Sequence, residues 1–210
     1  MADPPPVLTV IAGTNGAGKS SIVGQYIRQH GGDYFNPDEW AQVLRARDST
    51  LSQTDANSLA WQAGTDMLES AIEEGRDHVF ETTLGGNTIP LLIGRAAAQG
   101  HRVVIWYVGL DSPETHLRRV RARVQRGGHD IPEDKIRERF ERSIENLVTL
   151  VPHIHELKLF DNTAEADLAH GEAPGIRALL HMRDHKIVSC VELTEVPDWA
   201  KPVFLVCLAR

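Results

Sequence analysis

A glycine-rich segment near the start of the chain has the spacing of a phosphate-binding loop. It fits G-x-x-x-x-G-K-[ST] and consists of Gly13, Thr14, Asn15, Gly16, Ala17, Gly18, Lys19 and Ser20. Glycine lets the backbone approach phosphate oxygens closely, so that successive N–H groups can point at them. In this pattern Lys19 reaches the β- and γ-phosphates and the Ser20 hydroxyl ligates Mg²⁺. The sequence therefore predicts a nucleoside triphosphate site, with Ser21 as its last nucleotide-binding residue.

The segments on either side of this loop strengthen the prediction. An apolar run over residues 7–12 precedes the loop, and a helix-like segment over residues 19–30 follows it. This is the strand–loop–helix context that the motif requires, and the helix adds its positive N-terminal end to the site. A glycine-rich turn with no ligand is the alternative, and both flanks count against it.

Two polar segments follow predicted strands and are expected at the same edge of the sheet as the loop. The first is Asn36-Pro37-Asp38, and the second contains Glu81 and Thr83. Asp38 has the chemistry to accept a proton from an acceptor hydroxyl, a role compatible with the stabilisation that an acid gives to the first turn of a helix. We expect Glu81 to bond the acceptor or the water shell of Mg²⁺, and Thr83 to hold the acceptor. A strand-to-helix turn with no ligand role is the alternative for Thr83.

An arginine-rich segment over residues 118–130 has the features of a lid over the phosphates. Arg119, Arg123 and Arg126 share one helical face, Gly127-Gly128 supplies a hinge, and Arg139 lies on the following helix. Guanidinium groups stabilise the charge on a phosphoryl group in transfer, and a closing lid brings them in. A solvated basic face paired with nearby glutamates, or an RNA contact, is the alternative.

The elements that must position these residues alternate between strand and helix. Strands are expected over residues 7–12, 34–36, 78–81, 102–108 and 156–161. Helices are expected over residues 19–30, 54–74, 88–99, 113–125 and 133–150, with a further helix that opens at Pro37 behind Asn36 as its cap. This alternation predicts an α/β fold, a parallel sheet flanked by helices with right-handed crossovers, as in P-loop kinases.

The pattern changes after residue 163. Residues 186–192 and 202–208 read as strands, which predicts a β-hairpin-like extension over 163–210 of one P-loop kinase domain spanning 1–210. In the helix over 54–74, with Thr54 or Asp55 as its cap, the apolar residues that recur every fourth position are expected to face the core. These are Leu59, Ala63, Met67 and Ala71.

Composition narrows the class of protein. The 210 residues suit one domain, and the formal net charge of -7 argues against broad nucleic-acid binding. Cys190 and Cys207 lie in apolar runs, so reduced core thiols are expected, with a disulfide bridge as the alternative. Residues 1–6 lack the pattern of a signal peptide, and no apolar stretch is long enough to cross a bilayer, so a cytoplasmic protein is expected.

Missing motifs exclude several P-loop classes. The guanine-reading N-K-x-D, a GTPase-like D-x-x-G and an ABC-type L-S-G-G-Q signature are absent from the sequence. Asp111 lies beyond the end of its predicted strand, so a turn or helix cap is expected there rather than a Walker B aspartate. A phosphotransferase for a small molecule fits the motifs that remain.

Taken together, these motifs resemble the zeta toxin family of P-loop kinases. The match runs in order over residues 7–162 and includes the loop from Ala12 to Ser21, Phe35-Asn-Pro-Asp-Glu-Trp-Ala41, Phe80-Glu-Thr-Thr-Leu84, Arg123-Val-Gln-Arg-Gly-Gly-His-Asp-Ile-Pro132 and Asn162. The loop is specific for nucleotide only, whereas the combination of segments is much more specific. The long insertions that shape the pocket of larger toxins are absent, so nucleotide and catalytic roles transfer better than the acceptor.

The resemblance implies an ATP-dependent kinase that phosphorylates a sugar hydroxyl of UDP-N-acetylglucosamine. It implies Asp38 as general base, Glu81 and Thr83 as acceptor-binding residues, and Lys19 and Ser20 as nucleotide and Mg²⁺ ligands. Among the lid-region arginines it implies that two contact the phosphates; we choose Arg126 and Arg139, with Arg123 as the reserve. ATP is favoured by family habit, and GTP is not excluded. A nucleotide sugar and an antitoxin protein are the implied partners.

Other functions fit the same motifs. A kinase for another small metabolite, a nucleoside or an antibiotic needs no further residue. A nucleotide-dependent switch would use the loop and the lid but would leave Asp38 and Glu81 without a role. A kinase for nucleic-acid ends is disfavoured by the acidic balance. The histidines, including His129, are expected to be solvated or structural, with a phosphate contact as the alternative for His129.

Overall fold

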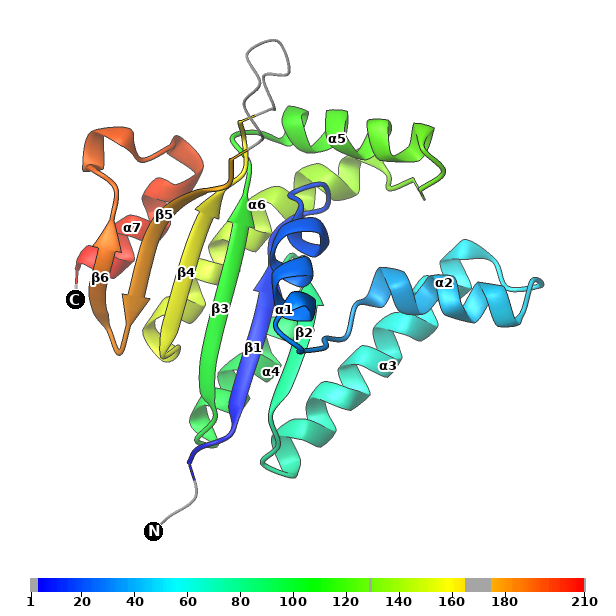
Figure 1. Cartoon of the computed structure of the whole chain (residues 1–210), viewed down its shortest axis with the longest axis horizontal. Helices are drawn as coiled ribbons and strands as arrows, with labels where there is room; N and C mark the ends of the chain where they lie inside the picture. The colour runs from blue at the N-terminus through cyan, green and yellow to red at the C-terminus, as the bar shows by residue number, and fades with distance from the viewer. Residues whose placement is uncertain (1–3, 129, 165–174, 210) are drawn as a thin grey trace.

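A mixed sheet with helices on both faces forms the frame of the computed structural model, which describes residues 4–128, 130–164 and 175–209 (Figure 1). In these residues the sheet has six strands in the order β2-β1-β3-β4-β5-β6. The strands are β1 (Val7–Ala12), β2 (His78–Thr82), β3 (Arg102–Gly109), β4 (Glu156–Asp161), β5 (Arg177–Arg183) and β6 (Lys186–Cys190). The first four are mutually parallel, and β5 and β6 are antiparallel additions. The predicted fold class is confirmed.

The helices form two unequal layers. They are α1 (Gln25–Gln29), α2 (Pro37–Arg47), α3 (Gln53–Glu73), α4 (Thr88–Ala98), α5 (Pro113–Gln125), α6 (Glu133–Leu150) and α7 (Lys201–Leu208). A π-helical turn, η1 (Ser20–Gly24), precedes α1, and short 3-10 turns are η2 (Val151–His153), η3 (Leu193–Glu195) and η4 (Asp198–Ala200). Figure 1 shows α1 on one face of the sheet and α4, α6 and α7 on the other, while α2 and α3 extend beyond the β2 edge.

Apolar burial on both faces of the sheet explains why the parallel strands were legible in the sequence. The larger core packs Val10 of β1 and Ile105 of β3 against α3, α4, α6 and α7. A smaller core places Ile11 and Val108 beneath η1 and α1. A parallel strand that is buried on both sides reads as a continuous apolar run, which residues 7–12 show.

The parallel register brings three carboxyl strand ends together. Ala12 pairs with Thr82 of β2 and with Tyr107 of β3, so the loop after β1 emerges beside the ends of both neighbours. The expected strand over residues 34–36 is a single bridge between Phe35 and Phe80. The Phe35 amide donates to Val79, and the Glu81 amide donates to the Phe35 carbonyl. This bridge holds the start of α2 against the end of β2.

The capping chemistry agrees with the prediction at α2 and differs at α3. The Asn36 side chain accepts from the Asp38 and Glu39 amides at the start of α2, as expected. The α3 cap is Ser52, whose hydroxyl accepts from the Asp55 amide at 3.1 Å, so the predictions of Thr54 or Asp55 were wrong. A serine followed three residues later by an acid is a known capping pattern, so Ser52 could have been predicted from the sequence.

The core-facing stripe of α3 was also predicted wrongly in part. Ala71 is buried as expected, but Leu59 and Met67 are exposed. The small residues Ala56 and Ala60 are buried instead, because they pack against α2 through Ala41. Leucine and methionine were chosen for their apolarity, whereas a close helix–helix contact selects small residues.

The C-terminal region contains the predicted hairpin but not from the predicted segments. The hairpin pairs β5 with β6, and the expected strand over residues 202–208 is helix α7. Val203, Phe204 and Cys207 face the core at helical spacing, and Pro202 occupies the first helical turn. A short apolar run fits strand and helix equally well, which explains the error. Cys190 and Cys207 are not joined by a disulfide bridge; Cys207 is buried, but Cys190 is exposed, so the expectation of a core position was wrong for Cys190.

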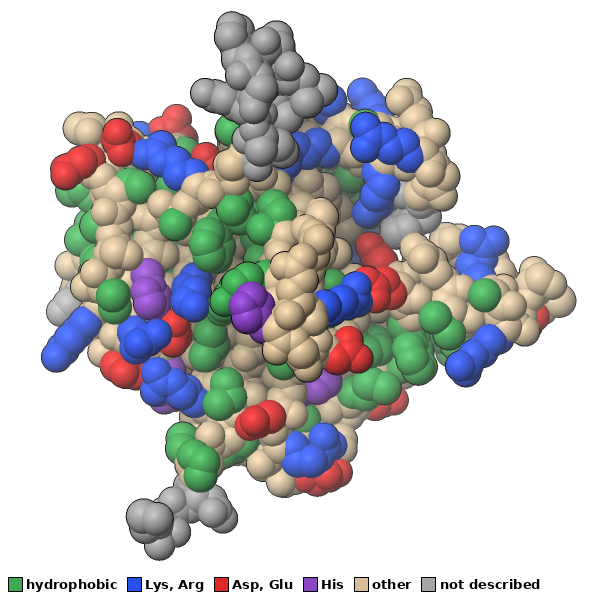
Figure 2. All heavy atoms as spheres, viewed as in Figure 1, with side chains coloured by type: hydrophobic (Ala, Val, Ile, Leu, Met, Phe, Trp, Pro, Cys, Tyr) green, Lys and Arg blue, Asp and Glu red, His purple; other side chains and the backbone are tan. Residues whose placement is uncertain are grey.

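The two helices of the predicted lid begin and end close to their expected positions. Ser112 caps α5 by accepting from the Thr115 amide and donates its own hydroxyl to Asp111, which lies in the turn before the helix. Figure 2 shows lysine and arginine side chains gathered over this helix. His129 lies outside the described residues. Among the described helices, none combines the length and apolarity that a membrane span requires.

Candidate active site

The glycine-rich loop adopts a conformation that its glycines make accessible. Gly16 and Gly18 have φ angles of 85° and 93°, a region that side chains disfavour. The loop is tied locally by the Ala17 amide, which donates to the Thr14 carbonyl at 3.1 Å. Lys19 follows and is buried with 6% of its surface exposed. A buried ammonium group needs an anionic or polar partner, and the structure provides one.

That partner is Glu81 at the end of β2. Lys19 Nζ lies 3.5 Å from Glu81 Oε1, and the Ser20 hydroxyl donates to Glu81 Oε2 at 2.7 Å. Asn36 Nδ2 lies 3.4 Å from the same carboxylate oxygen and 3.3 Å from Ser20 Oγ. The lysine, the hydroxyl and the carboxylate therefore form one cluster beside the loop.

Asn36 joins this cluster to Asp38. Its amide nitrogen faces Ser20 and Glu81, while its amide oxygen accepts from the Asp38 amide at 2.9 Å. The side chain is buried, so both ends are held in place. The sequence indicated Asn36 as a helix cap within a polar segment at the edge of the sheet. Its contacts with Ser20 and Glu81 depend on the bridge between Phe35 and β2, which no local pattern reveals.

A cavity of about 630 Å³ brings together predicted site residues from the loop, α2, β2 and α6. It is lined by the loop, by α2 and α3, by the end of β2 and by α6. The predicted residues that line it are Asn15, Lys19, Asp38, Glu81, Thr83 and Arg139. Asp38 and Lys19 thus face the same space, although one belongs to α2 and the other to the loop.

Arg139 is the predicted arginine that lies at the loop. Its Nη1 donates to the side-chain oxygen of Asn15 at 2.9 Å, and the stem of its side chain packs closely against Gly85. The remaining lid-region arginines take other positions. Arg123 Nη1 is 3.9 Å from Asp38 Oδ2, and Arg126 is exposed at the end of α5 and does not line the cavity in the described residues.

The main-chain carbonyl of Thr83 is bonded to a buried pair of hydroxyl groups at the floor of the site. The Ser143 hydroxyl of α6 donates to the Thr83 carbonyl at 2.7 Å, so the Tyr107 hydroxyl, 2.9 Å away, donates to Ser143. Burial raises the pKa of Tyr107 to about 12, which keeps its hydroxyl neutral. The network fixes α6 against the ends of β2 and β3, and thereby positions Arg139.

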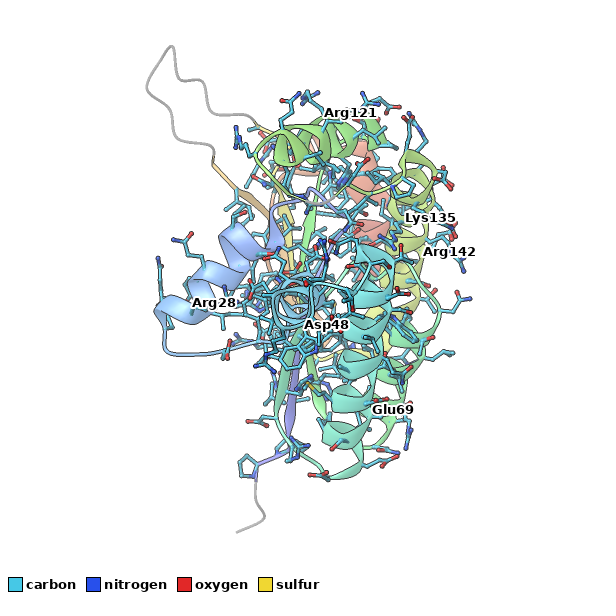
Figure 3. All side chains as sticks on the ribbon, turned by 90° about the vertical axis from the view of Figure 1, so that its right-hand side faces the viewer. Arg28, Asp48, Glu69, Arg121, Lys135 and Arg142 are labelled. Carbon is cyan, nitrogen blue, oxygen red and sulfur yellow. The ribbon has the colours of Figure 1, made fainter. Side chains whose placement is uncertain are left out.

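Several cavity residues were not singled out from the sequence. Lys135 and Arg142 lie on α6 with the spacing i and i+7, on the same face as Arg139, and Figure 3 shows both on one side of the molecule. Glu138 pairs with both, at 2.9 and 3.4 Å. Trp61 of α3 also lines the cavity while 47% of its surface is exposed. The spacing on α6 is a signal that the sequence contained.

Most of the chain matches one known protein family. A family model described as an AAA domain (AAA_33) matches residues 8–147, which contain the loop, Asp38, Glu81 and Arg139. The chain belongs to this AAA domain family. An uncharacterised protein of Haemophilus influenzae is 31% identical to this AAA domain protein over 132 residues, which cover 61% of the chain and 88% of the relative.

Solved structures share the fold at low sequence identity. The AvrRxo1-ORF1:-ORF2 complex with ATP has a chain that matches with a TM-score of 0.63 at 15% identity, over 96% of this AAA domain protein and 63% of that chain. This protein thus spans less than two thirds of the length of the AvrRxo1 chain that it matches. A structure from the PezAT chromosomal toxin–antitoxin system of Streptococcus pneumoniae matches with a TM-score of 0.56 at 12% identity, over 83% and 76% of the two chains. These likenesses show that the chain shares the P-loop kinase-like fold of these structures.

Proposed function

We propose that this AAA domain protein is a kinase that transfers the γ-phosphoryl group of ATP to a hydroxyl of a small acceptor. The observation that carries the proposal is the single cavity that Lys19 and Asp38 line together. A phosphate-binding lysine and a carboxylate that face the same space are the two groups that an in-line transfer to a hydroxyl needs. The ATP-containing AvrRxo1 complex, which shares the fold, supports the choice of nucleotide.

In this proposal the buried cluster around Glu81 forms the triphosphate and metal half of the site. Gly13 to Ser21 cradle the phosphates, and Lys19 bonds the β- and γ-phosphates. The Ser20 hydroxyl and the Glu81 carboxylate offer hard oxygen donors within 2.7 Å of each other, which suits Mg²⁺. Mg²⁺ binds through few protein oxygens and keeps several waters, so this pair fits the ion. When bound, the ion would neutralise charge on the phosphates.

Asp38, Thr83 and the arginines form the transfer half of the site. Asp38 takes the proton of the acceptor hydroxyl, while Glu81 and Thr83 border the space in which the acceptor would lie. Arg139 stabilises charge on the phosphoryl oxygens, and Arg123 and Arg126 reach them when α5 closes over the cavity. Arg123 has the shorter path of the two lid arginines, because it already lies near Asp38.

The acceptor we propose first is UDP-N-acetylglucosamine, on the resemblance to zeta toxins. A cavity of this volume suits a small molecule, with aromatic and cationic side chains near its mouth. Another small metabolite, a nucleoside or an antibiotic is the alternative acceptor. An antitoxin partner is proposed from the likeness to the PezAT structure, which is described as part of a toxin–antitoxin system.

Phosphorus NMR of ATP, Mg²⁺ and a panel of acceptors tests the reaction. We expect the γ-phosphoryl signal to be replaced by a phosphomonoester signal with one acceptor, and by none in the Lys19→Met variant. A phosphomonoester with UDP-N-acetylglucosamine supports the first acceptor, and one with another compound identifies the alternative. Slow hydrolysis to inorganic phosphate with every acceptor would contradict a kinase and favour a nucleotide-dependent switch.

A further inference from the structure

Two backbone carbonyls of the glycine-rich loop are held by buried side chains from outside the cavity. His116 Nδ1 of α5 lies 2.7 Å from the Asn15 carbonyl oxygen, and Asn162 Nδ2, just after β4, donates to the Ala17 carbonyl at 2.8 Å. His116 and Asn162 are 1% and 7% exposed, and neither lines the cavity described above. A carbonyl can only accept, so His116 Nδ1 carries the proton in this bond.

The geometry of the peptide unit gives these two bonds a consequence for the phosphates. A trans peptide is planar, so the carbonyl of one residue and the N–H of the next point in opposite directions. Holding the Asn15 carbonyl therefore sets the direction of the Gly16 N–H, and holding the Ala17 carbonyl sets that of the Gly18 N–H. Both glycines have positive φ and no side chain to restrain them, so the peptide units depend on such external contacts.

We propose that His116 and Asn162 are positioning residues that aim the Gly16 and Gly18 amides at the bound triphosphate. The inference rests on the nucleotide site of the proposed function, but not on phosphoryl transfer. Preorganised donors cost no reorientation when the anion arrives, which is why the direction of each N–H matters for affinity.

Both positioning residues are themselves fixed in the structure. Arg119 Nη2 donates to the main-chain carbonyl of Asn162 at 2.6 Å. The main-chain N–H of Asn162 donates to the carbonyl of Gly109 at the end of β3. The His116 ring meets Phe140 edge-on at 5.6 Å. Burial, with the nearby charges of Lys19 and Arg119, lowers the pKa of His116 to about 4, so its ring is neutral near pH 7.

The fit behind each glycine is tight. A Cβ atom on Gly18 would lie 2.6 Å from Asn162 Nδ2, and one on Gly16 would lie 3.0 Å from the His116 carbonyl. The loop thus rests directly against α5 and the segment after β4. A side chain of the wrong shape or polarity at 116 or 162 would let the adjacent peptide unit rotate.

Glycine-selective ¹⁵N NMR with two probes, ATP and inorganic pyrophosphate, separates positioning from simple support of the fold. In the wild-type protein we expect both the Gly16 and the Gly18 amide signals to shift with each probe. The His116→Leu variant should lose the Gly16 shift and keep the Gly18 shift, and Asn162→Asp, which cannot donate to a carbonyl, should show the reverse. Each variant should bind ATP about tenfold more weakly, the scale of one hydrogen bond.

The His116→Asn variant provides the matched control, because its amide nitrogen can take the place of Nδ1. We expect it to restore the Gly16 shift and most of the ATP affinity. If His116→Leu does not fold, the His116→Asn and Asn162→Asp variants still test the inference. Variants that are less stable yet keep both amide shifts and wild-type affinity would overturn it. If the wild-type glycines respond to neither probe, the nucleotide site itself fails and this inference falls with it.

Discussion

The two halves of the cavity differ in how firmly the fold holds them. We call the triphosphate and metal half the phosphate half, and the transfer half, which would hold the acceptor, the acceptor half. In the phosphate half Asn15, Lys19, Asn36 and Glu81 are all buried. Glu81 pairs with Lys19 and accepts from Asn36, and the Asn15 side chain accepts from Arg139. In the acceptor half the Asp38 side chain is 41% exposed, and Trp61 is nearly half exposed. Buried polar groups must have partners, so the phosphate half is organised before a ligand arrives.

This difference predicts which property a substitution in each half should affect. Substitutions in the phosphate half disturb a network that also joins α5 and α6 to the sheet, so they should affect nucleotide binding and stability together. Substitutions in the acceptor half remove half-exposed groups that the fold does not need. They should change transfer or acceptor affinity while the protein remains as stable as before.

The largest effect is expected at Asp38. In the Asp38→Asn variant, acceptor-dependent turnover should fall about 10²- to 10⁴-fold, the range for loss of a general base. ATP affinity should not change, because the buried phosphate half is intact. The matched control is Glu39→Gln, the next residue of α2, which loses an exposed ion pair with Arg28 and keeps a side-chain oxygen to accept from Asn36. Equal losses in the two variants, or none in Asp38→Asn, would refute the role of the carboxylate.

The second effect concerns stability and pH in the phosphate half. The pKa of His116 is lowered to about 4 from 6.5, because burial disfavours its charged form. Between these values the unfolded chain binds a proton that the folded chain does not, so stability falls as the pH drops from 7 toward 4. The loss amounts to roughly 3 kcal/mol.

Urea unfolding at several pH values measures this loss. The wild-type protein should lose roughly 3 kcal/mol more stability between pH 7 and pH 4 than the His116→Asn variant, which has no titrating group at that position. The carboxylates and the other histidines are common to both proteins, so their titration cancels in the difference. Parallel pH profiles for the two proteins would show that residue 116 titrates alike in the folded and unfolded states.

Much of the fold could be predicted from local patterns in the sequence. The bounds of β1 and α6 were predicted correctly, because a buried apolar run and an amphipathic helix with acids in its first turn are both legible within one segment. The same local reasoning was wrong for residues 202–208, where an apolar run of seven residues supports either element. It also predicted the buried residues on α3 wrongly in part, because the contact that selects small residues there is made with α2.

The site was less predictable than the fold because its contacts join distant segments. The loop motif was legible since its residues are consecutive. The bond from Asn36 to Glu81 spans 45 residues, that from His116 to Asn15 spans 101, and that from Arg139 to Asn15 spans 124. Each depends on strand order and helix packing. The sequence could place the loop, Asn36 and Glu81 at one edge of the sheet but could not pair them, and it did not single out His116.

The third effect compares arginines of α5 and α6. In Arg139→Ala, kcat should fall about 10- to 100-fold, because a donor that faces the loop and the developing charge is lost. The control is Arg137→Ala, two residues away, whose side chain makes exposed ion pairs with Glu114 and Glu133. Such pairs contribute at most about 1 kcal/mol, and turnover should be retained.

The lid arginines sharpen this comparison. Arg123→Ala and Arg126→Ala should each reduce kcat if α5 closes during turnover, with the larger reduction for Arg123, which already lies near Asp38. Steady-state kinetics with ATP and the acceptor identified by phosphorus NMR measures all four variants. A loss in Arg137→Ala that equals the loss in Arg139→Ala would mean that the outer face of α6, rather than the cavity, governs the reaction.

The smallest effect is expected at Trp61 in the acceptor half. An exposed indole at a cavity mouth can stack on a planar ring of the acceptor, such as the base of a nucleotide sugar. Loss of that contact in Trp61→Ala should raise the KM for the acceptor about tenfold, the lower end for stacking on an aromatic side chain, and leave the KM for ATP unchanged. Trp61→Phe should restore most of the affinity.

Leu59→Ala is the control for Trp61, since Leu59 lies two residues earlier on α3, is half exposed, and is not among the described residues that line the cavity. Its KM for the acceptor should match the wild-type value. If both variants raised this KM alike, the cause would be a general change in α3. If Trp61→Ala raised the KM for ATP instead, the division of the cavity into a phosphate half and an acceptor half would be wrong, because an α3 residue would then serve the nucleotide.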